Sequence, residues 1–325
     1  MNFFHTWVIL KICLILQRYW TNICSDGNGM IPDSIFEKRI AMKIIRTLYD
    51  MTEYRTRQRD RVASVGFVPT MGALHEGHLS LVEKAVKENA VTVVSVFVNP
   101  VQFNNQDDFA KYPRNEEEDF RKLAAAGVDA VFAPTAEEMY PENSEAKVYE
   151  LGNVAEVMEG KYRPGHFQGV ARVLDILFRL VNPHRAYFGE KDFQQIAVVR
   201  NLIKSEGLEV EIVACPIKRA DDGLALSSRN ERLDEEQRKM APEIYNTLKY
   251  SLEYSKDHSV KATHDTVVEH LDAMPGLRVE YFDIVDARTL APVEEWDESD
   301  WIVGCITVYC GEVRLIDNIA YRLPN

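Results

Sequence analysis

The chain has 325 residues, of which 46% are hydrophobic and 27% charged, and this composition is ordinary for a globular protein of about two domains. Its formal net charge of −13 argues against a nucleic-acid-binding protein, because such proteins usually present a basic face. The five cysteines are odd in number and match no zinc-ligand spacing, so we expect free thiols in a reducing cytoplasm.

Residues 1–41 differ from the rest of the chain. The apolar run from Trp7 to Leu16 is interrupted by Lys11 and is too short to predict a transmembrane helix. It also lacks the preceding basic segment and the small-residue cleavage site of a secretory signal. We therefore expect a disordered or mis-assigned extension ahead of a start at Met42, with no membrane partner. An interfacial anchor and a signal are the alternatives.

Three elements are expected directly after Met42. A helix is expected over residues 43–61, because Ile45, Leu48 and Met51 recur every three residues among charged side chains. A buried strand is expected from residue 65, where an apolar run stops at Pro69. A turn that contains glycines and an amphipathic helix follow it.

The next segments alternate between strands and helices. Residues 91–99 are nearly all apolar and β-branched, which is typical of a strand buried on both faces of a parallel sheet. Further strands are expected at 128–134, before residue 189 and at 208–216, with helices between them and a loop at 161–170. Five strands alternating with helices predict a doubly wound, Rossmann-like α/β domain over residues 42–219.

Beyond residue 219 the pattern changes. Long polar helices are followed by apolar segments at 278–290 and 301–319, which we interpret as strands, and CGE at 310–312 predicts a hairpin turn. Residues 220–325 are therefore expected to form a second, smaller α+β domain that acts as a lid.

The turn after the first buried strand is best suited to chemistry. Gly72 and Gly77 allow the backbone to approach a ligand closely. His75 and His78 lie on one face of the first helical turn if the helix begins near His75. Free N–H groups and the positive end of the helix dipole would point outward there. Two imidazoles at such an end predict a site for a phosphate whose charge grows during a reaction.

The acidic run Glu116–Asp119 has two interpretations. It is typical of a solvated helix start, where negative charge is favoured by the helix dipole. Alternatively, it takes part in placing a metal ion or a lysine.

Six motifs together resemble one enzyme family. They are FVPTMGALHEGHLSL, FVNPVQF, YPR, RPGHF, YFGEKDFQQ and DGLALSSRN, and they occur in this order. MGALHEGH, residues 71–78, is similar to the HIGH-type nucleotide site of nucleotidyltransferases and class I synthetases. Over residues 42–322 the full set resembles the pantoate–β-alanine ligase (pantothenate synthetase) family.

The resemblance implies a reaction in two steps. ATP adenylates the carboxylate of pantoate and releases pyrophosphate. The amine of β-alanine then attacks the pantoyl adenylate, giving pantothenate and AMP. The resemblance thus implies ATP as co-substrate, Mg²⁺, small-molecule substrates and a cytoplasmic homodimer.

The resemblance also implies roles for individual residues. His78 matches a proton donor, with His75 and Lys191 as further catalytic residues, and Gln102 and Gln195 match the glutamines that bind pantoate. The metal ligands stay open, and Asp192 is the side chain best suited to steer Lys191 or a hydrated Mg²⁺. The residues expected to bind ATP are Met71, Gly72, Ala73, Leu74, His75, Glu76, Gly77, His78, Gly189, Glu190, Lys191, Asp192, Lys218, Leu226, Ser227, Ser228 and Arg229.

Other interpretations stay open. A nucleotidyltransferase that moves AMP onto a phosphate-bearing acceptor would need additional Arg or Lys where FVNPVQF and DFQQ offer amides. A catalytically inactive nucleotide-binding or scaffold protein would have no need of both histidines together with Lys191. Arg163 and His166 either face the site or only support their own loop.

Overall fold

The computed structural model describes residues 42–59, 63–142 and 147–324, so the expectations for residues 1–41 lie outside the described residues. Within that part, six parallel strands form one sheet in the order β1-β4-β3-β2-β5-β6, and three antiparallel strands form another in the order β7-β8-β9. The strands are β1 (Lys43–Ile45), β2 (Val65–Thr70), β3 (Val91–Val96), β4 (Ala130–Phe132), β5 (Arg185–Gly189), β6 (Glu211–Cys215), β7 (Leu277–Asp286), β8 (Ile302–Cys310) and β9 (Val313–Arg322).

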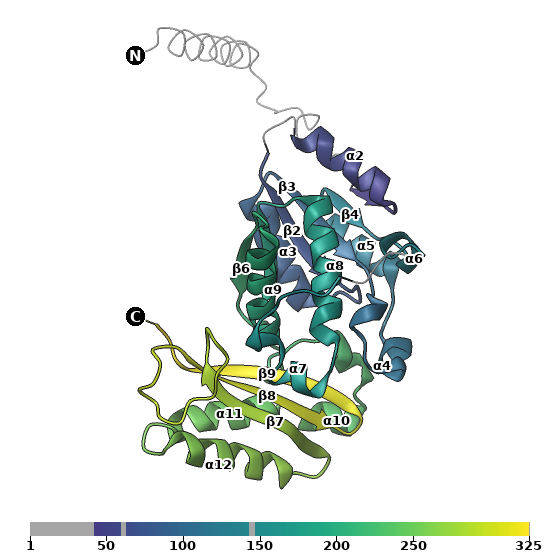
Figure 1. Cartoon of the computed structure of the whole chain (residues 1–325). Coiled ribbons are helices and arrows are strands. Elements are labelled where there is room, and N and C mark those ends of the chain that lie inside the picture. The colour runs from purple at the N-terminus through teal and green to yellow at the C-terminus, as the bar shows by residue number, and fades with distance from the viewer. Residues whose placement is uncertain (1–41, 60–62, 143–146, 325) are drawn as a thin grey trace, which may run out of the picture. The chain divides into compact units, whose positions relative to one another are not determined.

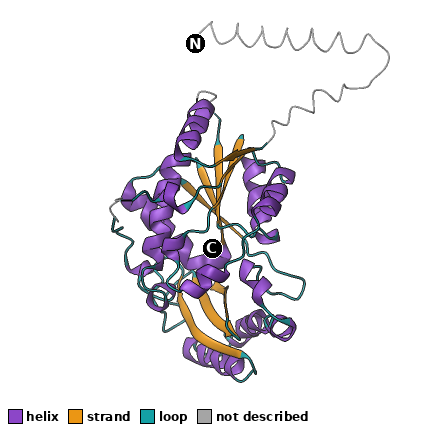
Figure 2. Cartoon of the chain, turned by 90° about the vertical axis from the view of Figure 1, so that its right-hand side faces the viewer, coloured by secondary structure: helices purple, strands orange, loops and turns teal. Residues whose placement is uncertain are grey.

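Helices cover both faces of the six-stranded sheet (Figure 2). Because side chains alternate along a strand, Phe67 points into a core shared with α2, α8 and α9, whereas Val68 points into a core shared with α3 and α5. Burial on both faces explains the continuous apolar runs in these strands. The helices of this part are α2 (Leu48–Arg59), α3 (Glu76–Glu88), α4 (Gln106–Lys111), α5 (Glu116–Ala125), α6 (Ala136–Met139), α7 (Glu159–Tyr162), α8 (His166–Val181) and α9 (Phe193–Glu206).

The antiparallel sheet lies between helices of its own and the region of α7 (Figure 1). Its helices are α10 (Glu235–Met240), α11 (Glu243–Tyr254) and α12 (Val260–Asp272), and their apolar faces pack on β7–β9 in a further core. The expected fold class is confirmed: a doubly wound parallel sheet is followed by a smaller α+β part with the expected hairpin. The domain boundary between residues 219 and 220 stays a prediction.

The helix expected over residues 43–61 is wrong in its first part. Lys43–Ile45 is a strand that pairs with Ala130–Phe132, and the helix begins only at Leu48. The side chain of Ile45 is buried, and its carbonyl oxygen accepts a hydrogen bond from the N–H of Ala133, directly after β4. Pairing with a distant strand outweighs the local periodicity, so the sheet has six strands rather than five.

The loop expected at residues 161–170 is also largely helical. Gly165 has a φ of 82°, which turns the chain so that α8 begins at His166. Position 169, inside this helix, is a glycine because a Cβ there would come within 2.3 Å of the carbonyl oxygen of Val101. Gly165 therefore allows a turn, and Gly169 allows a close contact between two backbone segments.

Candidate active site

A cavity of about 210 Å³ lies at the carboxyl ends of β2, β3, β5 and β6. The strand order reverses beside β2, because β3 lies on one side of it and β5 on the other. Open α/β sheets bind their ligands at such a switch point. The expected residues that line the cavity are Met71, His75, Gly77, His78, Gln102, Gly189, Lys191, Asp192, Gln195, Lys218, Leu226, Ser227, Ser228 and Arg229.

The other expected ATP residues, Gly72, Ala73, Leu74, Glu76 and Glu190, do not line this cavity. Gly72, Ala73 and Leu74 are buried behind its wall, where Gly72 and Ala73 have positive φ values of 79° and 49°. The structure therefore gives these three a supporting place in the turn rather than a place on its surface.

Asp119 holds this turn in place. Its carboxylate accepts hydrogen bonds from the backbone N–H groups of Ala73 and Leu74, at 2.8 and 2.7 Å, and Lys122 donates to the carbonyl of Leu74. Burial raises the pKa of Asp119, and the two N–H groups oppose that shift. Glu116, in contrast, pairs with Arg46 at the surface. Sequence reasoning missed Asp119, and its only signal was the acidic run itself.

The N–H groups expected to face a ligand are largely occupied. His75 caps α3: its Nδ1 accepts from the N–H of Gly77 at 3.1 Å, and Nδ1 of His78 accepts from the N–H of His75 at 3.5 Å. With the two groups bound by Asp119, few amides of this turn remain for an anion. Donors on this wall must therefore come mainly from side chains.

The two imidazoles are set up as such donors. Since each Nδ1 accepts a hydrogen bond, the neutral ring of each carries its proton on Nε2. Burial lowers the pKa of His75 to about 3, helped by His78 and Lys191, and lowers that of His78 to about 4, helped by Lys191 and Lys122. Without a ligand both rings are neutral at pH 7.

Lys191 reaches the cavity from the end of β5. It lies in a 3₁₀ turn, Glu190–Asp192, and its side chain is 16% exposed, with Nζ 3.8 Å from Asp192. The turn is held from the other sheet, because Nδ2 of Asn318 in β9 donates to the carbonyls of Glu190 and Lys191 at 2.8 and 3.2 Å. Asn318 was not expected to have a role.

The segment Leu226–Arg229 forms a further wall of the cavity. Ser228 donates to the carbonyl of Ala73, which joins this segment to the histidine turn. Arg229 donates to Asp108 of α4 at 2.8 Å, and Arg232 donates to the same carboxylate at 2.6 Å. Asp108 therefore already pairs with Arg229, the cation that we expect to bind phosphate.

The two glutamines also reach the cavity. Oε1 of Gln102 accepts from the buried Asn99 at 3.0 Å, and its Nε2 lies 2.9 Å from the sulfur of Met71. The amide is thus oriented to present a donor, and Asn99 is a second residue that sequence reasoning missed. Gln195, near the start of α9, lines this cavity and also a second one.

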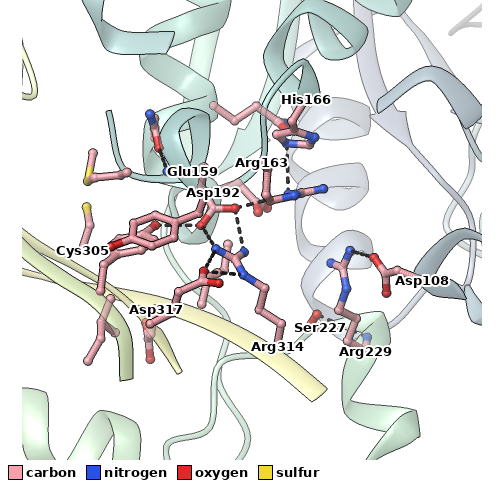
Figure 3. Close-up of a pocket in the computed structure, with 18 of the residues that line it drawn as sticks. Asp108, Glu159, Arg163, His166, Asp192, Ser227, Arg229, Cys305, Arg314 and Asp317 are labelled. Carbon is pink, nitrogen blue, oxygen red and sulfur yellow. Dashed lines mark hydrogen bonds and ion pairs between the residues drawn. The ribbon is translucent and has the colours of Figure 1, made fainter. Parts of the chain in front are cut away.

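The second cavity, of about 300 Å³, is drawn in Figure 3. It shares Lys191, Asp192, Gln195, Ser227 and Arg229 with the first, and it extends to β7–β9. Its wall carries the ion pair of Glu159 and Arg314, joined by two hydrogen bonds of 2.7 Å. Burial acts to raise the pKa of Glu159, but the hydrogen bonds and charge of Arg314 hold it well below its usual range.

Arg163 and His166 connect the two cavities. Nδ1 of His166 donates to the carbonyl of Gln102 at 2.8 Å, so its Nε2 accepts from Arg163 at 3.2 Å. Burial and the charge of Arg163 lower the pKa of His166 to about 3. His166 thus supports the backbone of a predicted pantoate residue, and both His166 and Arg163 line the second cavity.

Comparison with known proteins identifies the family. The model of the pantoate–β-alanine ligase family matches residues 43–320. The chain belongs to this family. It is 54% identical over 281 residues to a pantothenate synthetase of Porphyromonas gingivalis, covering 86% of this chain and all of the relative.

Solved structures agree. The pantothenate synthetase of Thermus thermophilus superposes with a TM-score of 0.81 at 45% identity, over 87% of this chain and all of that one. The ligase of Francisella tularensis, in complex with beta-gamma ATP and β-alanine, gives a TM-score of 0.72 at 33% identity, over 86% of this chain and 98% of that one.

These matches confirm the expected family and the expected activity, an ATP-dependent ligase that forms pantothenate. The matches favour this ligase activity over AMP transfer to a phosphate-bearing acceptor. None of the helices among the described residues is long and apolar enough to span a membrane. The same part of the chain contains no cluster of three or more His, Cys, Asp or Glu that could hold a metal ion.

Proposed function

We propose that the first cavity binds ATP and pantoate side by side and forms pantoyl adenylate, which β-alanine then converts to pantothenate. One observation supports this assignment most strongly. The histidine pair, Lys191 and Arg229 share a single cavity with two neutral amides, those of Gln102 and Gln195. Cationic and N–H donors suit the phosphates, and amides suit the acid to be activated.

The donors match the charge that develops in the first step. A carboxylate oxygen of pantoate attacks the α-phosphorus of ATP, and negative charge moves to the bridging oxygen and the leaving pyrophosphate. Nε2–H of His75 and of His78 would stabilise that charge from one side, and Nζ of Lys191 from another. A bound triphosphate would also raise the pKa of both rings, which helps His78 to act as a proton donor.

Neutral amides suit the pantoate subsite better than a lysine would. A lysine there would stabilise the ground-state carboxylate and blunt its attack on phosphorus. Because Asn99 occupies Oε1 of Gln102, the Nε2 group is the one presented to substrate. The glutamines would thereby select the acid, and the cations would activate ATP.

Mg²⁺ fits this site as a companion of ATP rather than as a resident ion. Mg²⁺ usually keeps several waters and is held by substrate phosphates with one or two carboxylates. Asp192 lines both cavities and its side chain is 49% exposed, so it would hold a hydrated ion through water. The ion would supply charge neutralisation of the phosphates.

The assembly and location of the protein are part of the proposal. The family resemblance supports a homodimer in the cytoplasm, acting on small molecules alone. Light scattering of the purified chain tests the dimer, and a mass of one subunit would contradict it.

One assay tests the central assignment. The purified chain is incubated with ATP, Mg²⁺, pantoate and β-alanine, and pantothenate and AMP are measured. We expect equal amounts of both, and pantoate-dependent exchange of pyrophosphate into ATP when β-alanine is omitted. Folded protein that forms neither product would refute the proposal.

A further inference from the structure

Arg163 is a largely buried cation that shares its carboxylate partner with a second arginine. Its side chain is 16% exposed, and its Nη1 lies 3.2 Å from Glu159 and 3.2 Å from His166, which is neutral. Among the described residues, its Nε and Nη2 have no hydrogen-bond partner. An arginine with unused donors in a polar cavity suits a ligand with a carboxylate or phosphate group.

Glu159 shares its negative charge between Arg163 and Arg314. Its carboxylate already accepts two bonds from Arg314 and one from Tyr281, all at 2.7 Å, and one from Thr307 at 3.1 Å. Oε1 accepts three of these bonds, and Oε2 accepts one from Arg314 and the one from Arg163. The contact with Arg163 is the longest of the set, and it involves Nη1 of the guanidinium.

The other guanidinium groups of the second cavity are already engaged. Arg314 uses its Nε and both terminal nitrogens on Glu159 and Glu280. Arg229 and Arg232 share Asp108 on the side of α4. Figure 3 shows Arg163 below His166, between that ring and Glu159. Through His166, Arg163 is also linked to the backbone of Gln102 in the predicted pantoate subsite.

The proposed reaction also requires a space from which the amine substrate can approach, and the second cavity provides one. Once pantoyl adenylate fills the first cavity, the amine must reach the acyl carbon from adjoining space. The second cavity shares five lining residues with the first, namely Lys191, Asp192, Gln195, Ser227 and Arg229. An amine substrate that also carries a carboxylate would need a cation away from the reacting atoms.

We propose that Arg163 binds the carboxylate of the amine substrate in the second cavity and so selects a short ω-amino acid over a simple amine. This inference rests on the proposed function. The ammonium group first loses a proton to water, and its lone pair then forms the C–N bond. The bond from the acyl carbon to the phosphate oxygen breaks, AMP leaves with that electron pair, and the amide nitrogen releases a second proton to water.

The test separates the two half-reactions in Arg163→Ala and Arg163→Lys. Arg163→Ala is expected to raise the KM for β-alanine about 30-fold or more, because a buried charge partner is lost. Arg163→Lys should recover part of that loss. Pantoate-dependent exchange of pyrophosphate into ATP, which needs no amine, should change by less than about threefold. Lys111→Gln removes an exposed charge from the rim of the same cavity and should leave the KM within about twofold.

A second substrate makes the result specific. Propylamine has the amine of β-alanine without its carboxylate, so the wild-type preference for β-alanine in kcat/KM should collapse in Arg163→Ala. An unchanged preference would overturn the inference. So would loss of pyrophosphate exchange with an unchanged KM for β-alanine, because Arg163 would then serve the phosphates. If the wild-type protein itself shows no exchange, the proposed function fails instead.

Discussion

The two walls of the first cavity are held by different means. On the histidine side, Asp119 and the capping imidazoles fix the turn through hydrogen bonds to its own backbone. In the wall formed by Leu226–Arg229, Arg229 is held by Asp108, a charge that a phosphate can replace. If the cavity binds ATP as proposed, one wall is prepared before ATP arrives, whereas the other would exchange its partner when ATP binds. Variants that damage either wall should have effects of different size and kind.

The largest effect is expected at the prepared wall. His78→Ala removes an Nε2–H donor and should lower turnover by about 10²- to 10⁴-fold. Circular dichroism and pantothenate formation measure folding and turnover. His78→Gln restores an N–H donor near the same position and should recover part of the rate. Near-normal turnover in folded His78→Ala would remove this residue from its role.

The next largest effect is expected for Asp119, which supports the same wall. Asp119→Asn replaces an acceptor of two N–H groups by an amide that can accept both only at one oxygen. We expect a loss of about 1–3 kcal/mol in the free energy of unfolding and a KM for ATP raised about tenfold. Glu117→Gln is the matched control, because Glu117 is exposed on the same helix. Equal behaviour of the two variants would contradict a special role for Asp119.

The neutral histidines predict a pH dependence of stability. His166 is 6% exposed and has a folded pKa of about 3, below its unfolded value of about 6.5. The unfolded chain therefore binds more protons in this window, and stability is lost as the pH falls. The contribution of His166 between pH 6.5 and pH 5 is about 1.5–2 kcal/mol. Denaturant unfolding at both pH values should show a smaller loss in His166→Gln than in the wild type, and an equal loss would contradict the assignment.

The smallest effect is expected at the exchangeable wall. Asp108→Asn removes the competitor for Arg229, and because the pair is about a quarter exposed, the KM for ATP should fall about two- to fivefold. Asp107→Asn makes the same change at the exposed neighbour and should leave the KM unaltered. A raised KM in Asp108→Asn would mean that Asp108 positions Arg229 in the ATP complex instead.

The sequence predicted those parts of the fold that local patterns determine. The β-branched run of β3, the start of α3 at its histidine cap and the hairpin of β8 and β9 each follow from neighbouring residues. β1 was missed because it forms by pairing with β4, more than eighty residues away. Local periodicity contains no information about such a partner.

The site shows the same limit. His75, His78, Lys191 and the glutamines were predicted because their motifs are contiguous, and all of them line one cavity. Asp119 and Asn318 were not found, because each acts on a backbone segment far along the chain, 46 residues away for the contact of Asp119 with Ala73. Nothing in an acidic helix start or an alternating strand distinguishes such a residue from its neighbours.

The contact of Asn318 with the Lys191 turn has a consequence for inactivation by heat. Asn318 of the smaller sheet holds the turn of Lys191, which follows a strand of the larger sheet and has a predicted catalytic role. If β7–β9 loosen first on warming, the lysine turn loses its support while the parallel sheet is still intact. We therefore expect activity to disappear at a lower temperature than the helical signal. The working limit of the enzyme would then be set by its smaller sheet.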